Sequence, residues 1–191
     1  MPHTFELAAS GRSKCRGCGI ALAKGELRFG ERLPNPFAEG EVTHWFHPRC
    51  AAYKRPESFK EGLQVAEPET PDGTAPNLPH GAAPELPDRA ALEAIADAGI
   101  LHARLQRIDG AEKSPGSQAK CRNCKEPIVK GTWRIRLVYH EEGNFAPGGY
   151  IHVTCRNAYF EAGGIAEQVL HFSPALEEAD RTELRSALEA S

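Results

Sequence analysis

The sequence predicts an α+β protein made of two small tandem units, each stabilised by a metal site and joined through a proline-rich linker. Six cysteines fall into two groups with similar spacing, the residues around the two groups match, and short strand-like and helical segments accompany each group. The expected divisions are a first finger at 1–65, the linker at 66–87, a helix and strand connector at 88–112, a second finger at 113–172 and a C-terminal helix at 173–191.

Composition excludes several protein classes. The chain has 191 residues, of which 26% are charged and 7% aromatic, so it is neither collagen-like nor charged enough to be disordered throughout. No apolar run approaches the roughly 20 residues that span a bilayer, and the N-terminus does not resemble a signal peptide. We therefore expect an intracellular protein without a membrane partner, located in the cytoplasm or nucleoid of a prokaryote or in the nucleus of a eukaryote.

Charge is distributed unevenly along the chain. Residues 1–60 carry a net charge of +4 and residues 113–160 carry +5, whereas the remaining residues together carry −12. Each basic segment contains one of the cysteine groups and is a candidate anion-binding face. The alternative is that these cations form an ordinary solvated surface.

The cysteines and two histidines have the spacing of metal ligands. Each group begins with C-x-x-C and ends with H-x-x-C, with 28 intervening residues in the first group and 27 in the second. Three thiolates and one imidazole satisfy a tetrahedral Zn²⁺ ion. The sequence therefore predicts two Zn²⁺ sites, formed by Cys15, Cys18, His47 and Cys50, and by Cys121, Cys124, His152 and Cys155.

Other uses of these cysteines fit the pattern less well. A disulfide framework suits a secreted chain, and a thioredoxin-like site requires a βαβ context. An iron–sulfur cluster usually takes four cysteines, or two histidines with two cysteines. A catalytic zinc keeps one coordination position open, whereas four protein ligands close the shell.

Local patterns predict the elements around each zinc site. Alternating segments at 5–7 and 101–105 predict a strand leading into each finger, and 26–29 and 133–138 predict strands within the fingers. Leucines at helical spacing predict helices that begin near Asp88 and Asp180, each capped by the aspartate.

Three further side-chain roles follow from the repeat. Glu183 occupies the capping-box position relative to Asp180. Tyr53 and Tyr159 follow the last zinc ligands at helical spacing and are expected in the core. His44 is expected on the surface or facing DNA, because its counterpart in the second group is a glycine.

Basic and aromatic residues recur at matching positions in the two units. Each unit has Lys-Cys-Arg-x-Cys, then Lys-Gly, then an arginine ten residues after the second cysteine. An aromatic residue precedes each ligand histidine by two positions, and another lies in each preceding loop, Phe37 and Phe145. Cations can bind phosphates, and exposed aromatic rings can stack on bases.

The first group resembles the PARP-type zinc finger, the DNA-break sensor of poly(ADP-ribose) polymerase and of some DNA ligases. The resemblance rests on Gly-Arg-Ser-Lys-Cys-x-x-Cys at 11–18, Lys-Gly-Glu-Leu-Arg at 24–28 and Trp-Phe-His-x-x-Cys at 45–50. It covers residues 5–55 well and 113–160 less closely. The family implies binding to nicks and strand ends, where basic residues hold phosphates and a loop or helix terminus stacks on an exposed base pair.

The resemblance implies a role for individual residues. Arg12 and Arg28 match phosphate-contacting positions, Phe37 lies in the base-stacking region, and Trp45 matches an aromatic near the contact surface. In the second finger Arg134 is retained, whereas Gln118 replaces Arg12. With the recurrent cations included, the predicted DNA contacts are Arg12, Lys14, Arg16, Lys24, Arg28, Phe37, Trp45, Lys120, Arg122, Lys130, Arg134, Arg136 and Phe145.

We therefore expect a zinc-dependent protein that binds nicked or broken DNA in repair, together with repair-protein partners. No Walker A loop, nucleophile elbow or ligase lysine motif is found, so catalysis is not expected. Two alternatives remain open: a zinc-scaffolded protein–protein adaptor, and a module that binds single-stranded nucleic acid or RNA.

Overall fold

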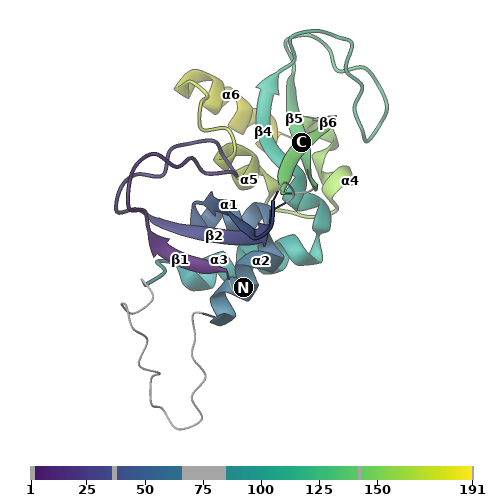
Figure 1. Cartoon of the computed structure of the whole chain (residues 1–191). Helices are drawn as coiled ribbons and strands as arrows, with labels where there is room; N and C mark the ends of the chain where they lie inside the picture. Colours follow the sequence, from purple (N-terminus) through teal and green to yellow (C-terminus); the bar gives the residue numbers. More distant parts are fainter. Residues whose placement is uncertain (1–2, 36–37, 66–84, 142, 191) are drawn as a thin grey trace, which may run out of the picture. The chain divides into compact units, whose positions relative to one another are not determined.

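A computed structural model of the chain describes residues 3–35, 38–65, 85–141 and 143–190 (Figure 1). The chain divides into two units, Met1–Ile100 and Leu101–Ser191. Each unit combines a small antiparallel sheet with helices and contains one Cys₃His group. The predicted α+β class and the tandem arrangement of two zinc-type units are confirmed. The division between the units falls inside the 88–112 segment, so its helix and its strand belong to different units.

The first unit contains a three-stranded sheet and three helices. Its strands pair in the order β1-β2-β3, and all pairs are antiparallel. The elements are β1 (Thr4–Leu7), β2 (Leu27–Pro34), β3 (Glu41–Phe46), α1 (Pro48–Lys54), α2 (Pro56–Val65) and α3 (Arg89–Leu101). Figure 1 shows that β1 and β2 lie next to each other, and the register pairs Phe5 with Phe29.

Aromatic side chains form the core of the first unit. Phe29 of β2 is fully buried, and its ring centroid lies 5.2 Å from that of Phe5 and 5.6 Å from that of Phe59 on α2. Offset and edge-on pairs at such distances are favourable packing arrangements for aromatic rings. The next residue, Gly30, has to be a glycine, because a Cβ atom there would lie 2.7 Å from the Trp45 ring. The absence of a side chain at Gly30 therefore leaves room for the Trp45 ring, which extends from the paired position on β3 over the Gly30 backbone.

The second unit repeats the three-stranded sheet and adds two short 3₁₀ helices and three α-helices. Its strands pair in the order β4-β5-β6, again antiparallel. The elements are η1 (Ala103–Arg107), β4 (Ile108–Lys113), β5 (Trp133–Glu141), β6 (Asn144–His152), η2 (Val153–Cys155), α4 (Arg156–Phe160), α5 (Ile165–His171) and α6 (Glu178–Glu189). Aliphatic residues fill this core, among them Ile135, Ile151 and Leu184, each fully buried.

The expected lead-in strand at 101–105 is wrong. This segment holds the last residue of α3 and the start of the short 3₁₀ helix η1, in which the Leu105 backbone N–H donates to the His102 carbonyl. The lead-in strand of the second unit is β4, which begins at Ile108. Leu105 is buried, so its apolar character reflects packing and not membership of a strand.

The expected helix caps are also corrected. α6 begins at Glu178, so Asp180 lies within its first turn and does not cap it. Asp180 and Glu183 instead accept hydrogen bonds of 2.8 Å from Lys113 of β4. Asp88 precedes α3 with a positive φ of 56°, outside the extended region that a capping residue adopts.

The remaining sequence expectations have different outcomes. Tyr159 is buried as expected, and Tyr53 is half-buried. Residues 66–84, most of the expected linker, lie outside the described part of the chain. Among the described residues, no helix is both long enough and apolar enough to cross a membrane.

The first unit contains a buried ion pair that allows a stability test. The Glu31 side chain has no exposed surface, and its Oε1 accepts hydrogen bonds from Arg55 Nε at 2.6 Å and from Ser58 Oγ at 2.7 Å. Arg55→Met should lower the free energy of unfolding by about 3–5 kcal/mol, because it leaves a buried carboxylate without its cation. Urea denaturation in excess zinc measures this change.

The matched control is Arg89→Met, which removes the Arg89–Glu93 pair of α3, whose two side chains are about one third exposed. Exposed pairs of this kind contribute at most about 1 kcal/mol. Equal losses for the two variants would contradict the structural role assigned to Glu31 and Arg55.

Candidate metal centres and nucleic-acid interface

The four predicted ligands of the first unit come together at one point. Cys15 and Cys18 lie on a tight turn closed by the Gly19 N–H, which donates to the Cys15 carbonyl at 2.8 Å. His47 follows β3, and Cys50 lies in the first turn of α1. The ligand atoms of all four side chains lie within 4.8 Å of one another.

Distances within this cluster fit a tetrahedral zinc ion. His47 Nδ1 lies 3.4 Å from Cys18 Sγ and 3.8 Å from Cys50 Sγ. Zn–S and Zn–N bonds of about 2.3 and 2.0 Å at tetrahedral angles would separate sulfur from nitrogen by about 3.5 Å. The backbone N–H groups of Gly17 and His47 donate to Cys15 Sγ at 3.3 Å, which favours the thiolate that zinc requires.

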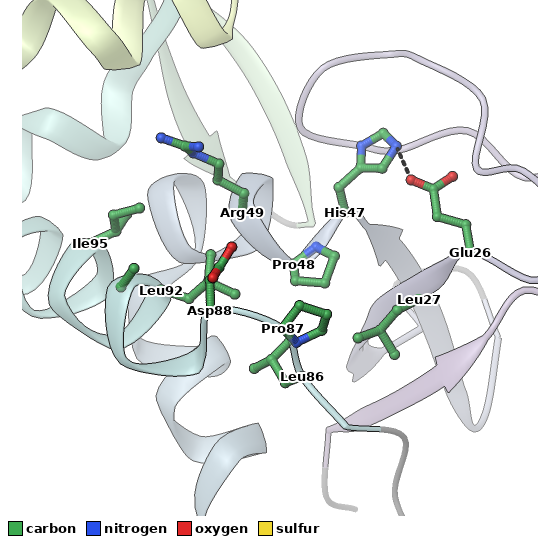
Figure 2. Close-up of a pocket in the computed structure, with 11 residues that line it drawn as sticks. Glu26, Leu27, His47, Pro48, Arg49, Leu86, Pro87, Asp88, Leu92 and Ile95 are labelled. Atoms are coloured by element: carbon green, nitrogen blue, oxygen red, sulfur yellow. Dashed lines mark ion pairs between the residues drawn. The ribbon is translucent and has the colours of Figure 1, made fainter.

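The outer nitrogen of the first imidazole faces a carboxylate. His47 Nε2 lies 3.3 Å from Glu26 Oε1, the contact drawn as a dashed line in Figure 2. The other oxygen of Glu26 accepts the Ala23 backbone N–H at 2.7 Å, so the carboxylate is itself held in place. A carboxylate at this position fixes the ring orientation and raises the basicity of the ligand nitrogen.

The second cluster repeats the geometry with a different outer partner. The ligand atoms of Cys121, Cys124, His152 and Cys155 also lie within 4.8 Å of one another. His152 Nδ1 lies 3.4 Å from Cys124 Sγ and 3.8 Å from Cys155 Sγ, while Nε2 faces the Pro127 carbonyl oxygen at 3.2 Å. Both clusters are therefore compatible with zinc, and they differ in what orients the histidine.

Protonation of the metal-free clusters opposes metal binding. Hydrogen bonds with the Cys15 and Cys18 sulfurs raise the pKa of His47 to about 10. Burial, reinforced by the neighbouring Cys124 thiol, raises the pKa of Cys155 to about 11. Because zinc binds the deprotonated groups, binding must release protons and strengthen as the pH rises.

Arg28 and Arg134 are built into their units. The Arg28 guanidinium donates to Glu6 Oε1 at 2.5 Å, and its central carbon lies 3.6 Å from the centroid of the Trp45 ring. In the second unit Arg134 makes the same contacts with Glu112 and Tyr150, also at 2.5 and 3.6 Å. We call this arrangement the Glu–Arg–aromatic stack.

Burial favours a structural role for the stack. Arg28 is only 8% exposed and Arg134 only 6%, so each presents little surface to a phosphate. Each guanidinium also donates at 3.2 Å to a serine, Ser13 or Ser114, and thereby links the sheet to the segment before the zinc turn. Sequence reasoning found the arginine and the aromatic ring of each stack but missed the glutamate and the serine. A glutamate occurs at the same place in both lead-in strands, Glu6 and Glu112, and this recurrence could have indicated the partner of each arginine.

Other predicted cations lie on the surface beside the zinc turns. In the first unit, residues 13–14 and 21–22 pair in a short hairpin, with the Leu22 N–H donating to the Ser13 carbonyl. In the second unit, residues 119–120 and 127–128 pair in the same way. The predicted cations exposed on or beside these two hairpins are Arg12, Lys14, Arg16, Lys24, Lys120, Arg122 and Lys130.

Arg16 and Arg122 pack differently in the two units. Arg16 Nη2 lies 3.0 Å from His44 Nε2, and His44 is 8% exposed, so the expectation that His44 lies on the surface is wrong. In the second unit Gly149 replaces this histidine, and a Cβ atom there would lie 2.8 Å from Arg122 Cδ. The Arg122 side chain therefore packs directly on the backbone of β6.

The predicted aromatic contacts are only partly described. Phe37 lies outside the described residues. Trp45 is half-buried, and one face of its ring is covered by Arg28. Phe145 is half-buried with its ring centroid 5.1 Å from that of His140. Arg136 donates to the Asp109 carbonyl at 2.7 Å, which ties it to β4.

The stack predicts that Arg28 affects stability. Arg28→Ala should lower the stability of the first unit by about 2 kcal/mol, because it removes a shielded cation–π contact together with the bonds to Glu6 and Ser13. Arg12→Ala, a change at an exposed arginine, should alter it by no more than about 0.5 kcal/mol. Thermal unfolding with zinc present distinguishes the two. Equal stability of both variants would support a surface role for Arg28.

His44 should titrate below the ordinary histidine range. Burial is the main cause that lowers the pKa of His44, and the charge of Arg16 adds to it. A depressed pKa in the folded state means that the unfolded chain binds the proton more readily, so His44 reduces stability as the pH falls below about 6.5. Imidazole resonances in an NMR titration measure this pKa, and Arg16→Ala should raise it. A value at or above 6.5 would contradict the buried placement.

The amino-acid sequence is similar to those of several known proteins. Residues 6–76 match the family described as "Poly(ADP-ribose) polymerase and DNA-Ligase Zn-finger region". The whole chain is 26% identical to poly [ADP-ribose] polymerase 1 of Gallus gallus and 24% identical to polynucleotide 3'-phosphatase ZDP of Arabidopsis thaliana, and the matches cover 19% and 29% of those proteins. A poly [ADP-ribose] polymerase of Sarcophaga peregrina is 29% identical over 81% of the chain and 16% of its own length.

The chain thus spans less than a third of the length of these relatives. The family match at residues 6–76 contains the first Cys₃His cluster. The matches to the Gallus gallus polymerase and the Arabidopsis thaliana phosphatase cover the whole chain and so contain the second cluster as well. With a cluster of zinc-type geometry in each unit, the chain is a PARP-type zinc finger protein.

Proposed function

We propose that this protein binds two structural zinc ions and uses the surface of its first finger to recognise breaks in intracellular DNA, without catalytic activity of its own. The observation that carries the proposal is the exposed set of cations beside the turn that holds Cys15 and Cys18, in a chain whose residues 6–76 match the PARP and DNA-ligase finger family. The relatives that match over the whole chain include a protein named as a polynucleotide 3'-phosphatase and one named as poly [ADP-ribose] polymerase 1, which supports a place in DNA repair.

Zinc supports the proposal through the stability of small units. Each cluster joins a turn that precedes the second strand of the sheet to the end of the third strand. A small apolar core alone would stabilise such a contact only weakly. Structural zinc contributes roughly 10–16 kcal/mol of apparent binding energy in finger peptides at neutral pH. Four protein ligands fill the coordination shell, which favours a structural role over a catalytic one.

Exposed cations on the first finger suit the DNA backbone. Arg12, Lys14 and Lys24 lie on or beside one hairpin, where Gly11 approaches the Lys24 backbone nitrogen. Phosphates attract such cations whatever the sequence, so this surface supplies affinity without base specificity.

Break recognition requires an apolar contact as well as charge. An intact duplex hides its base-pair faces, whereas a nick or an end exposes one to stacking. Ile20 is 48% exposed on the zinc turn beside the paired Lys14 and Ala21, and so adds an apolar side chain to the basic surface. We propose that Ile20 and Phe37 meet the exposed base pair, and that the phosphate contacts hold the strands on either side.

The second finger is assigned a supporting role. It retains Lys120, Arg122 and Lys130 on the surface, but Gln118 replaces Arg12, and Phe145 packs against His140. Backbone binding by this finger would raise affinity for any duplex and leave the preference for breaks to the first finger.

Metal content tests the structural part of the proposal. The purified protein should contain two zinc ions per chain, and Cys18→Ser or Cys124→Ser should each reduce the content to about one. Because each site stabilises its own unit, each variant should lose the folded NMR signals of one unit and keep those of the other. Elemental analysis and ¹H–¹⁵N spectra provide both readouts. A content of one zinc, or iron in place of zinc, would refute the assignment.

Break preference is tested with a nicked circle and a covalently closed circle of the same sequence, so that free ends do not compete. A stacking contribution of about 1–3 kcal/mol should favour the nicked circle by roughly 5- to 150-fold. Phe37→Ala should remove most of this preference while salt-dependent binding persists. Phe145→Ala is the matched control and should change the preference less. Equal affinity of the native protein for both circles would contradict break recognition.

Salt dependence distinguishes the phosphate contacts from the alternatives. Lys24→Ala should flatten the slope of log K against log[salt] by about one, whereas Arg185→Ala, at an exposed arginine of α6, should leave it unchanged. Binding to single-stranded RNA as tight as to nicked duplex would favour the RNA module, and salt-independent binding would favour the adaptor.

A further inference from the structure

A buried histidine holds the exposed side chain of Arg16 against the first sheet. Arg16 follows Cys15 in the zinc turn, and its backbone N–H donates to the Trp45 carbonyl oxygen of β3 at 2.8 Å. The Arg16 side chain is exposed, and its Nη2 lies 3.0 Å from Nε2 of His44, which is only 8% exposed. Both the backbone and the guanidinium of Arg16 are therefore attached to β3. The pocket beside the same zinc site (Figure 2) is lined by other residues and does not take part in this contact.

The chemistry of the contact sets the state of the imidazole. A guanidinium can only donate hydrogen bonds, so Nε2 of His44 must accept and carry no proton. The proton of the neutral ring then lies on Nδ1. Burial lowers the pKa of His44, and the charge of Arg16 lowers it further, which keeps the ring neutral at neutral pH. Under these conditions the buried ring is an acceptor for Arg16.

Neighbouring buried side chains hold the His44 ring in place. His44 pairs with Glu31 of β2, so the two side chains lie side by side on one face of the sheet. Glu31 is fully buried and accepts hydrogen bonds from Arg55 at 2.6 Å and from Ser58 at 2.7 Å. The support behind Arg16 therefore includes side chains from two strands and from the start of α2.

The second unit holds the equivalent arginine in another way. Gly149 occupies the position of the histidine, and a Cβ atom there would lie 2.8 Å from Cδ and 3.3 Å from Cγ of Arg122. The aliphatic part of Arg122 thus fills the space that a histidine side chain would need. The imidazole acceptor is a feature of the first finger and not of the repeat as such.

We propose that His44 is a positioning residue, which holds the Arg16 guanidinium so that other N–H groups of Arg16 bind a DNA phosphate. This inference rests on the proposed function of the first finger and adds Arg16 to the cations of its DNA-binding surface. A guanidinium has five N–H donors, so a bond to the imidazole leaves donors for a phosphate. A long side chain that is already ordered loses less freedom on binding than a mobile one. His44 itself does not contact the DNA and acts through Arg16.

The experiment measures affinity for a covalently closed circle of duplex DNA, which offers phosphates but no break. His44→Asn carries its amide near the position of Nδ1, too short to reach Arg16. It should weaken binding by roughly 2- to 12-fold, the contribution of ordering one long side chain. His44→Gln places an amide oxygen near the position of Nε2 and should restore most of the affinity. The zinc content should be the same in both variants and in the native protein.

A double-mutant cycle separates positioning from a general structural role. Arg16→Ala removes the phosphate contact itself and should weaken binding at least as much as His44→Asn does. In the Arg16→Ala background, His44→Asn should have no further effect, because the histidine then has no guanidinium to position. Arg185→Ala, at an exposed arginine of α6, is the control for the loss of one positive charge and should bind nearly as tightly as the native protein.

Nitrogen NMR tests the same contact without any substitution. Long-range ¹H–¹⁵N spectra of the ¹⁵N-labelled, zinc-loaded full chain identify which ring nitrogen of His44 carries the proton. Nε2 should be the unprotonated nitrogen both in the free protein and in the complex with a short intact duplex. A protonated Nε2 in the complex would indicate that His44 binds the phosphate directly and would overturn the positioning role.

Three results of the binding experiments would also overturn the proposal. They are native affinity of Arg16→Ala, equal weakness of His44→Gln and His44→Asn, and an equal effect of His44→Asn with and without Arg16. Each of these leaves DNA binding in place and so contradicts this inference alone, whereas a native protein that binds neither circle would contradict the proposed function as well. If His44→Asn does not fold, the affinity of Arg16→Ala and the NMR measurement still decide the question.

Discussion

Four ligand atoms from distant parts of the chain must meet at one point in each unit, and the local structure follows from that requirement. The turn between Cys15 and Cys18 needs a glycine where Cys50 approaches, because a Cβ atom on Gly17 would lie 2.8 Å from Cys50 Cβ. The histidine must follow a strand, and the last cysteine must lie one helical turn further on. Since each unit is small, a metal ion held by these ligands would replace much of the apolar core that a larger domain buries.

Residue spacing predicted the features that depend on short-range geometry. Both ligand sets, the duplication and the helices near Asp88 and Asp180 are readable because a turn or a helix repeats at a fixed interval. The strand assigned to 101–105 was wrong because alternating apolar residues also occur where a helix ends and a short 3₁₀ helix begins, and here only Leu105 is buried. The capping box was wrong because Glu183 bonds to Lys113, 70 positions away, which no local pattern reveals.

Counting cations does not distinguish the buried arginines from the exposed ones in the candidate nucleic-acid interface. Arg28 and Arg134 recur in the two units because each holds a glutamate, a serine and an aromatic ring together. Recurrence alone does not distinguish an arginine that binds an external phosphate from one that binds an internal carboxylate. The distinction depends on a partner 22 residues earlier in the chain, on the neighbouring strand, and becomes visible only once the strand register is known.

The group that faces the outer nitrogen of each ligand histidine differs between the two fingers, and this difference should give them different affinities for zinc. A carboxylate holds His47 and makes its ligand nitrogen the stronger donor, whereas a neutral carbonyl holds His152, and the adjoining Cys124 is exposed to competing chelators. When zinc is scarce, we therefore expect the first finger to fill before the second. The finger with the more complete basic surface is then also the finger that we expect to keep its fold longest as zinc is removed.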